Sequence, residues 1–265
     1  MSNDQSATHD PSSVVFDDPA QLGRQVAAAA RPLLVGLDID GVLSPLVDHA
    51  DDAQLLPGVA DVLVRLLTIE GVTIAAVSGR ALQSMRTFGL PDAMQLVGSH
   101  GMEANDEAFQ PLGSDERNRL DQLISLADEA AAAAGDGGWV EHKQASVAVH
   151  TRTADSFTGP AALAALAVRA GTVDGAAIKP GSDVLELFAR HASKGTAITK
   201  LALDTAAACT VFVGDDLTDE EAFAALGDGD VTVKVGTASS VAAHRLRDPS
   251  AVLEFLAALA TACTT

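Results

Sequence analysis

The stretch LLVGLDIDGVL, residues 33–43, decides the fold of this chain. Residues 33–37 are all apolar, as expected of a strand buried on both faces of a parallel sheet, and Asp38 and Asp40 follow at once. Two carboxylates this close repel each other, and their burial is costly unless a cation, a proton or a phosphate offsets it. The stretch is therefore either a solvated turn after a strand or a site that holds a charged ligand.

Short apolar runs of the same kind recur along the chain, separated by segments with helical periodicity. The predicted strands after 33–37 are 72–77, 95–98, 210–213 and 231–235. The predicted helices are 58–69, 81–88, 194–207, 218–226 and 249–261. Strands that alternate with helices predict an α/β fold, with a doubly wound parallel sheet covered by helices on both faces.

Residues 105–187 follow a different pattern. They contain a helical segment at 119–134, an alternating, half-exposed strand at 139–152, a helix at 159–170 and a hairpin within 175–188. This pattern predicts an α+β unit with antiparallel strands, inserted as a cap over the catalytic edge of the sheet. We therefore predict a flexible acidic tail at 1–16, a catalytic core at 17–104 and 188–265, and a cap at 105–187.

Composition excludes several classes of function. Seventeen Lys and Arg residues against 36 Asp and Glu give a formal charge of −19, the wrong sign for binding nucleic acid or an anionic membrane. The first residues lack the basic and apolar regions of a signal peptide, and no run of apolar residues is long enough to span a bilayer. Two cysteines cannot form a disulfide framework, which fits a reducing compartment. We expect a cytoplasmic monomer.

Chemically useful groups follow three of the predicted strands. Asp38 and Asp40 follow the first, Ser78-Gly79-Arg80 the second, and Asp215-Asp216 the strand at 210–213. Ligands of open parallel sheets bind outside the carboxyl ends of the strands, so these groups are expected to converge. Four acids in one crevice require a cation, and an all-oxygen donor set suits Mg²⁺.

Such a cluster supports phosphoryl transfer. With Mg²⁺ present, one carboxylate is free to attack phosphorus and form an aspartyl-phosphate, while a second acid protonates the leaving oxygen and then activates water. Ser78 and the neighbouring backbone N–H groups can donate hydrogen bonds to phosphoryl oxygens. Lys194, at the predicted start of a helix, can neutralise charge as the group transfers.

Each motif also has an ordinary structural explanation. A lone D-x-D-G fits a turn, Ser-Gly is a common connection from strand to helix, and Lys194 alone would be a surface lysine. The stretch GDDLTDEEAF at 214–223 also fits a loop and a helix capped by Thr218, with Glu221 completing the capping box. His49 and the acids around it at 48–52 fit a solvated loop. The ordered combination of all four motifs is what favours shared chemistry.

These motifs resemble those of the haloacid dehalogenase superfamily of phosphohydrolases, and within it the trehalose-phosphatase family. DIDGVL at 38–43, SGR at 78–80, SKG at 193–195 and GDDLTDEEAF at 214–223 match the four motifs in order. The resemblance covers residues 31–262. It implies a haloacid dehalogenase-like core with an inserted α+β cap, and hydrolysis of trehalose 6-phosphate, the last step of trehalose biosynthesis.

The resemblance also implies roles for single residues. Asp38 would be the nucleophile and Asp40 the acid and base. The residues that would hold Mg²⁺ are Asp38, the carbonyl of Asp40 and Asp215, with Asp216 and Asp219 in support. Those that would bind phosphate are Ser78, Gly79 and Lys194.

Two further stretches resemble the family's substrate-reading segments, namely GSHGME at 98–103 and EHKQASVAVHTR at 141–152. The residues that would bind the substrate are Arg80, His100, Gly101, Glu141, Lys143, Arg152 and Glu186. Charged side chains form strong hydrogen bonds with sugar hydroxyls, which agrees with these roles. The alternation at 141–152 equally fits the outward face of an amphipathic strand.

The chain departs from the family pattern at three places. Val42 stands where the first motif usually has Thr, and Ser182 where the family usually has a basic residue. Phe188-Ala189-Arg190 replaces an Arg-Pro pair, so Arg190 or Lys179 is a candidate for the missing cationic contact. These departures bear on the prediction of the substrate more than on the prediction of the reaction.

Three other functions remain open from the sequence. The chain could be a phosphatase for sucrose phosphate or a glycosyl phosphoglycerate, a phospho-accepting signalling module of the receiver type, or a catalytically silent binding protein. Receiver domains lack both a second carboxylate two residues after the nucleophile and a large inserted cap, whereas this sequence has both.

Overall fold

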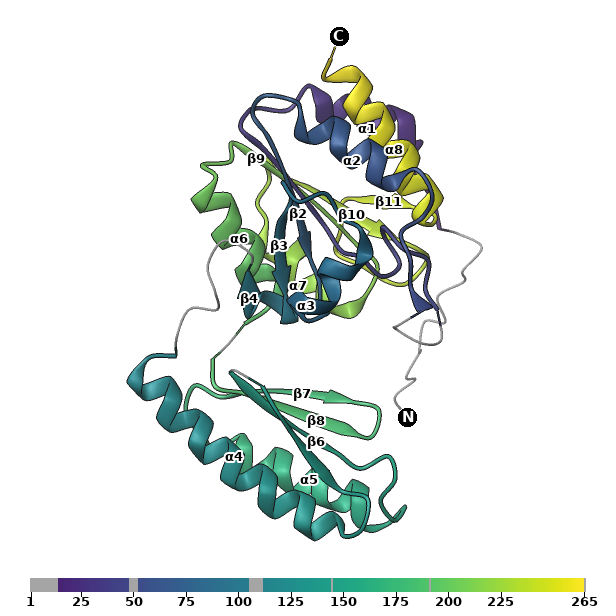
Figure 1. Cartoon of the computed structure of the whole chain (residues 1–265). Helices are drawn as coiled ribbons and strands as arrows, with labels where there is room; N and C mark the ends of the chain where they lie inside the picture. Colours follow the sequence, from purple (N-terminus) through teal and green to yellow (C-terminus); the bar gives the residue numbers. More distant parts are fainter. Residues whose placement is uncertain (1–13, 48–51, 105–111, 144, 191, 265) are drawn as a thin grey trace, which may run out of the picture. The chain divides into compact units, whose positions relative to one another are not determined.

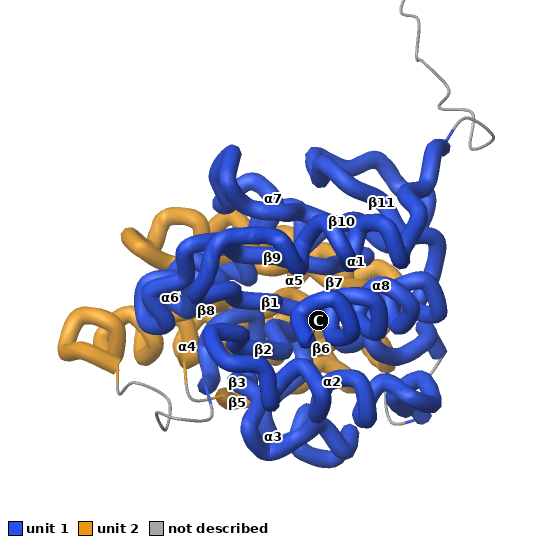
Figure 2. Tube along the Cα trace, turned by 90° about the horizontal axis from the view of Figure 1, so that it is seen from above, with its two compact units in different colours: residues 1–108, 193–265 blue, residues 109–192 orange. Residues whose placement is uncertain are grey.

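The computed structural model describes residues 14–47, 52–104, 112–143, 145–190 and 192–264. The chain divides into two compact units, the first formed by Met1–Ala108 and Ser193–Thr265 and the second by Phe109–Ala192 (Figure 2). Residues 1–13 of the predicted tail and 48–51 of the predicted acidic loop lie outside the described residues. The boundaries that we predicted at 104/105 and 187/188 stay predictions.

The described part of the first unit contains a sheet of mostly parallel strands (Figure 1). Its strands are β1 Leu33–Leu37, β2 Val72–Val77, β3 Gln95–Gly98, β4 Glu103–Ala104, β9 Cys209–Gly214, β10 Val231–Val235 and β11 His244–Leu246. Their order is β11-β10-β9-β1-β2-β3-β4, and every neighbouring pair is parallel except β3 and β4. The strand from the opening stretch, β1, thus lies between β9 and β2.

Both faces of this sheet are covered, because alternate residues of each strand pack into different hydrophobic clusters. Leu33, Val35 and Leu37 of β1 pack into one cluster, while Leu34 packs into the other. The first cluster includes α1 Pro19–Ala27, α2 Val59–Leu67 and α8 Pro249–Ala262, and the second includes α6 Lys194–Asp204 and α7 Leu217–Ala225 (Figure 1). The predicted doubly wound α/β architecture is confirmed.

The helix α1 was missed from the sequence. It begins after the N-cap Asp18, whose carboxylate accepts a hydrogen bond from the N–H of Gln21 at 2.6 Å, and Pro19 occupies its first position. An Asp-Pro pair before an apolar period is a recognisable helix start, so the signal was present. None of the helices in the described ranges is long and apolar enough to cross a membrane.

The second unit is an antiparallel sheet with two helices on one face. Its elements are α4 Ser114–Ala134, β5 Trp139–His142, β6 Ser146–His150, α5 Thr158–Ala170, β7 Ala177–Gly181 and β8 Val184–Phe188, with strand order β5-β6-β8-β7. The α+β character and the hairpin predicted within 175–188 are confirmed. The single strand predicted at 139–152 is wrong.

That stretch folds back on itself as the hairpin β5–β6, with Val140 paired with Val149 and the N–H of Lys143 donating to the carbonyl of Ser146 at 2.9 Å. The apolar positions change phase at this turn, because the even-numbered Val140 shares a face with the odd-numbered Val149. A single period of two over 139–152 would have placed these two side chains on opposite faces of the sheet.

Candidate active site

The carboxyl ends of three neighbouring strands bring the predicted catalytic residues to one edge of the first unit's sheet. Asp38 follows β1, Ser78 follows β2 and Asp215 follows β9. Backbone hydrogen bonds fix this edge, because the N–H of Asp38 donates to Val213 at 3.0 Å and that of Ser78 to Val97 at 2.9 Å. A cavity of about 580 Å³ lies here, lined mostly by polar residues: Asp38, Asp40, Ser78, Gly79, Arg80, His100, Lys194, Asp215, Asp216 and Thr218, with Leu46 and Val47.

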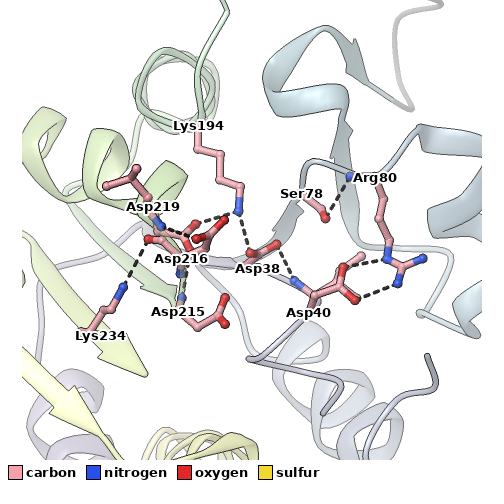
Figure 3. A network of polar contacts seen from close by, with 11 residues as sticks. Asp38, Asp40, Ser78, Arg80, Lys194, Asp215, Asp216, Asp219 and Lys234 are labelled. Atoms are coloured by element: carbon pink, nitrogen blue, oxygen red, sulfur yellow. Dashed lines mark hydrogen bonds and ion pairs between the residues drawn. The ribbon is translucent and has the colours of Figure 1, made fainter. Parts of the chain in front are cut away.

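Lys194 connects two buried carboxylates of this site (Figure 3). Its Nζ lies 2.6 Å from Oδ2 of Asp38 and 2.7 Å from Oδ1 of Asp219, and only 2% of Lys194 and none of Asp219 is exposed. The residue is placed by the start of α6, where the Ser193 side chain accepts the N–H of Thr196. Burial alone would lower the pKa of Lys194, but the two carboxylates raise it above its usual value, so the residue stays charged.

The loop after β9 is organised around Asp219. Its Oδ2 accepts the N–H groups of Asp215 at 2.8 Å and Asp216 at 2.9 Å, and the Asp216 carboxylate accepts the N–H of Leu217 as the N-cap of α7 (Figure 3). The alternative of a helix capped by Thr218, with Glu221 completing the capping box, is therefore wrong. Asp216 and Asp219, which have the same spacing, form the capping box instead, so the helix begins earlier.

Three of the acids form a cluster that fits a divalent cation. Asp38, Asp215 and Asp219 each offer one carboxylate oxygen, and these atoms lie within 4.8 Å of one another. Burial raises the pKa of Asp38 to about 6 and that of Asp215 to about 7, and neighbouring carboxylates add to both shifts. Lys194 supplies one positive charge against three carboxylates, so a second cation would stabilise their ionised forms.

Gly41 allows Asp215 to reach this cluster. Its φ is +70°, and a Cβ at this position would collide with the Asp215 carboxylate. The D-x-D-G motif thus needs glycine for two reasons, the left-handed backbone and the space that a side chain would take.

Asp40 is held by Arg80. Nε and Nη2 of Arg80 each donate to one oxygen of the Asp40 carboxylate, both at 2.7 Å (Figure 3). The guanidinium carbon lies 4.5 Å from the centre of the Phe88 ring. Such a bidentate pair fixes both the direction and the rotation of the carboxylate. The sequence predicted substrate binding for Arg80, which stays a prediction; the contact with Asp40 was not foreseen.

A strained turn places His100 beside this pair. Ser99 and His100 have φ values of +48° and +57°, and the N–H of His100 donates to the carbonyl of Ser78 at 3.0 Å. Glu103 secures the turn by accepting the Ser99 hydroxyl at 2.8 Å. The imidazole lies so close to Gly79 that a Cβ there would collide with it. The roles predicted for His100, Gly79 and Gly101 in binding stay predictions.

The remaining predicted substrate residues belong to the second unit. Lys143 donates to Glu186 at 2.9 Å and lies 4.0 Å from Glu141, so the structure brings these three together. Arg152 follows β6 and is exposed. Of the two candidates for the missing cationic contact, Arg190 forms an ion pair with Glu116 at 2.7 Å.

One buried residue of the site was missed. Lys234 lies in β10 with 2% of its surface exposed, and its Nζ donates to the carbonyl of Asp216 at 3.2 Å (Figure 3). The same Nζ lies 3.3 Å from the carboxylate of Glu220. It therefore supports the acidic loop from the side opposite Lys194. A lysine inside the apolar run VTVKV was the signal, since buried lysines need a partner.

Comparison with known proteins agrees with the family resemblance of the sequence motifs. The family model described as trehalose-phosphatase matches residues 36–254. The trehalose-6-phosphate phosphatase of Escherichia coli is 30% identical over 229 residues, which cover 85% of each chain. A protein of Mycobacterium tuberculosis described as an uncharacterized glycosyl hydrolase is 34% identical over 89% of this chain, which spans only 19% of that longer protein.

Among solved structures, the C-terminal domain of Candida albicans trehalose-6-phosphate phosphatase superimposes with a TM-score of 0.71 at 22% identity. The match covers 93% of this chain and 97% of that one. At this level of identity the likeness concerns the fold, and it includes both units.

Proposed function

Since the chain belongs to the trehalose-phosphatase family, we propose that it hydrolyses trehalose 6-phosphate to trehalose and phosphate. The observation that carries the proposal is the buried contact of Lys194 with Asp38 and Asp219 beside a cavity lined by further polar residues. A lysine buried between two carboxylates contributes little to stability compared with apolar packing, so its position favours a functional role.

In the proposed mechanism Asp38 attacks the phosphorus atom. One of its oxygens accepts the N–H of Ile39 at 2.7 Å and the other accepts Lys194, so the carboxylate is held without rotation. A bond forms between phosphorus and an Asp38 oxygen as the ester bond to the sugar oxygen breaks. Lys194 and the hydroxyl of Ser78 stabilise the charge on the transferring group.

Asp40 would move the protons of both steps. It donates a proton to the leaving sugar oxygen, and the resulting carboxylate then accepts a proton from the water that attacks phosphorus and releases phosphate from Asp38. The bidentate contact with Arg80 orients Asp40 and favours its carboxylate form, which accepts the proton of the water in the second step. For the first step Asp40 carries that proton, and the oxygen that bears it has to leave its bond with Arg80. A carboxylate at this position also favours a phosphatase over a phospho-accepting signalling module, which keeps its phosphate.

We propose Mg²⁺ as the cofactor. Asp38, the carbonyl of Asp40 and Asp215 would hold it, with Asp216 and Asp219 in support. When bound it would offset the charge of the carboxylates and of the substrate phosphate.

Phosphate release from trehalose 6-phosphate, with and without Mg²⁺, tests this function. Asp38→Asn should abolish release while the far-UV circular dichroism stays unchanged, and Asp61→Asn on the exposed side of α2 is the matched control. Sucrose phosphate and a glycosyl phosphoglycerate should be poorer substrates. Faster release from either one would refute the proposed substrate, and parental activity of Asp38→Asn would refute the nucleophile.

A further inference from the structure

The sheet of the second unit has two very different faces. Val147, Val149, Leu185 and Leu187 point to the face that packs against α4 and α5. The opposite face carries no described helix of this unit. The residues that alternate with the packed ones lie on it, among them Trp139, Glu141, Ser146, Ala148, His150 and Glu186.

The polar side chains of this second face are connected, and its centre is buried, since Ser146 is 4% and Ala148 1% exposed. Nζ of Lys143 and the hydroxyl of Ser146 both donate to the same oxygen of Glu186, at 2.9 and 2.7 Å. Nε2 of His150 lies 3.0 Å from the Glu141 carboxylate, which can only accept, so the imidazole N–H donates. The face thus offers fixed carboxylates and an ammonium group, which are suited to sugar hydroxyls.

Trp139 lies at the edge of this network, stacked on His150. The ring centres are 4.0 Å apart and the planes differ by 7°, so the imidazole covers one face of the indole. The tryptophan is nevertheless 51% exposed, because β5 is the edge strand of the sheet. Because His150 covers one face of the indole, the exposed half is available for a contact on the rest of the ring.

This arrangement has the two parts that recognise a pyranose. A flat aromatic ring contacts the face of the sugar that carries its C–H bonds, and nearby charged groups bind the hydroxyls around the rim. Exposure alone is weak evidence, since Phe157 at the start of α5 is 82% exposed with no such surroundings. The stacked imidazole matters because it fixes the indole plane and donates to the carboxylate beside it.

We propose that Trp139 is a stacking platform for a glucose ring of the substrate, and that His150 is the positioning residue which holds both Trp139 and Glu141. The proposal rests on the proposed function, because it takes the substrate to be a disaccharide phosphate. It adds a specificity determinant to the charged residues of the face.

The intrinsic fluorescence of the protein reports on Trp139, because the chain has one tryptophan and no tyrosine. In full-length protein with Asp38→Asn, which should not turn over substrate, trehalose 6-phosphate is expected to change the tryptophan fluorescence saturably. Trehalose in the parental protein should do the same at higher concentration. Inorganic phosphate should leave the emission unchanged, since it offers no ring to stack.

Kinetics give the second readout. Trp139→Ala should raise KM for trehalose 6-phosphate about tenfold with kcat little changed, as expected when an interaction common to ground and transition state is removed. Trp139→Phe should restore most of the affinity, because it keeps a ring. His150→Gln should also raise KM, and Phe157→Ala is the control that should change neither constant.

The outcomes separate this proposal from the function on which it rests. If the parental protein releases phosphate from trehalose 6-phosphate but Trp139→Ala keeps the parental KM, the platform is refuted and the function stands. Equal fluorescence changes with phosphate and with the sugar phosphate also refute it. If the protein releases no phosphate, a saturable change with trehalose still supports the platform, and its absence refutes it.

Discussion

Replacing Lys194 with Met should destabilise the first unit in a way that depends on pH. The substitution keeps much of the side-chain volume but leaves Asp38 and Asp219 as buried carboxylates without their shared cation, which lay 2.6 and 2.7 Å away. Removing one partner of a buried ion pair costs about 3–5 kcal/mol, so we expect a loss of this size in the free energy of unfolding at about pH 8 without metal.

The dependence on pH follows from Asp38. Burial already raises its pKa to about 6, and Lys194 acts in the opposite direction, so the pKa rises further when Lys194 is removed. When folding raises the pKa of a carboxyl group, the folded state loses stability as the pH increases from the pKa of that group in the unfolded chain to its pKa in the folded protein. The deficit of Lys194→Met should therefore be smaller at about pH 5, where only the lost contact with Asp219 contributes, and reach its full size above the new pKa of Asp38.

Urea unfolding followed by far-UV circular dichroism, at both pH values, measures the deficit. The control is Lys200→Met, which removes an ion pair with Asp204 at 2.6 Å, where both side chains are more than half exposed. Exposed pairs of this kind contribute less than about 1 kcal/mol. A deficit at pH 8 no larger than that of the control, or one that does not change with pH, would refute the reasoning.

Three further predictions concern the same site. Mg²⁺ should raise the melting temperature more at about pH 8 than at about pH 5, because the pKa of Asp215 is raised to about 7 and its carboxyl group is protonated in acid. An equal rise at both pH values would contradict the role of Asp215 as a metal ligand. Gly41→Ala should lower stability and phosphate release more than Gly89→Ala, since both glycines have positive φ but nothing lies near Gly89; equal effects would show that the Asp215 contact is unimportant. Arg80→Gln should lower kcat about 10²-fold with little change in melting temperature, because it frees Asp40, and parental kcat would exclude a role in positioning.

The central strands of the fold could be predicted because each one corresponds to a short run of neighbouring residues in the sequence. LLVGL at 33–37 and VTIAAV at 72–77 are strands with the predicted bounds, since a continuous apolar run can be buried on both faces only in the middle of a covered sheet. The candidate site followed from the same feature, because parallel strands end at one edge. The residues after them, such as Asp38 and Asp215, had to meet there.

Which side chains contact one another could not be predicted in the same way. The pattern at 139–152 predicted one alternating strand and not the reversal between Lys143 and Ser146, which brings Val140 and Val149 to the same face. Nothing in the sequence paired Arg80 with Asp40, 40 positions earlier, or stacked Trp139 on His150 across the hairpin. These contacts depend on strand register and on the direction of each side chain.

The sequence by itself therefore determined the kind of chemistry, because four motifs at the ends of strands and helices specify which groups gather at one edge. Tertiary structure alone decided how those groups are held. Lys194 lies between Asp38 and Asp219, and Lys234 lies beneath Asp216, only because separate elements pack around them. The physical reason is that apolar periodicity records burial within one element, whereas hydrogen bonds and ion pairs form between elements that are distant in the chain.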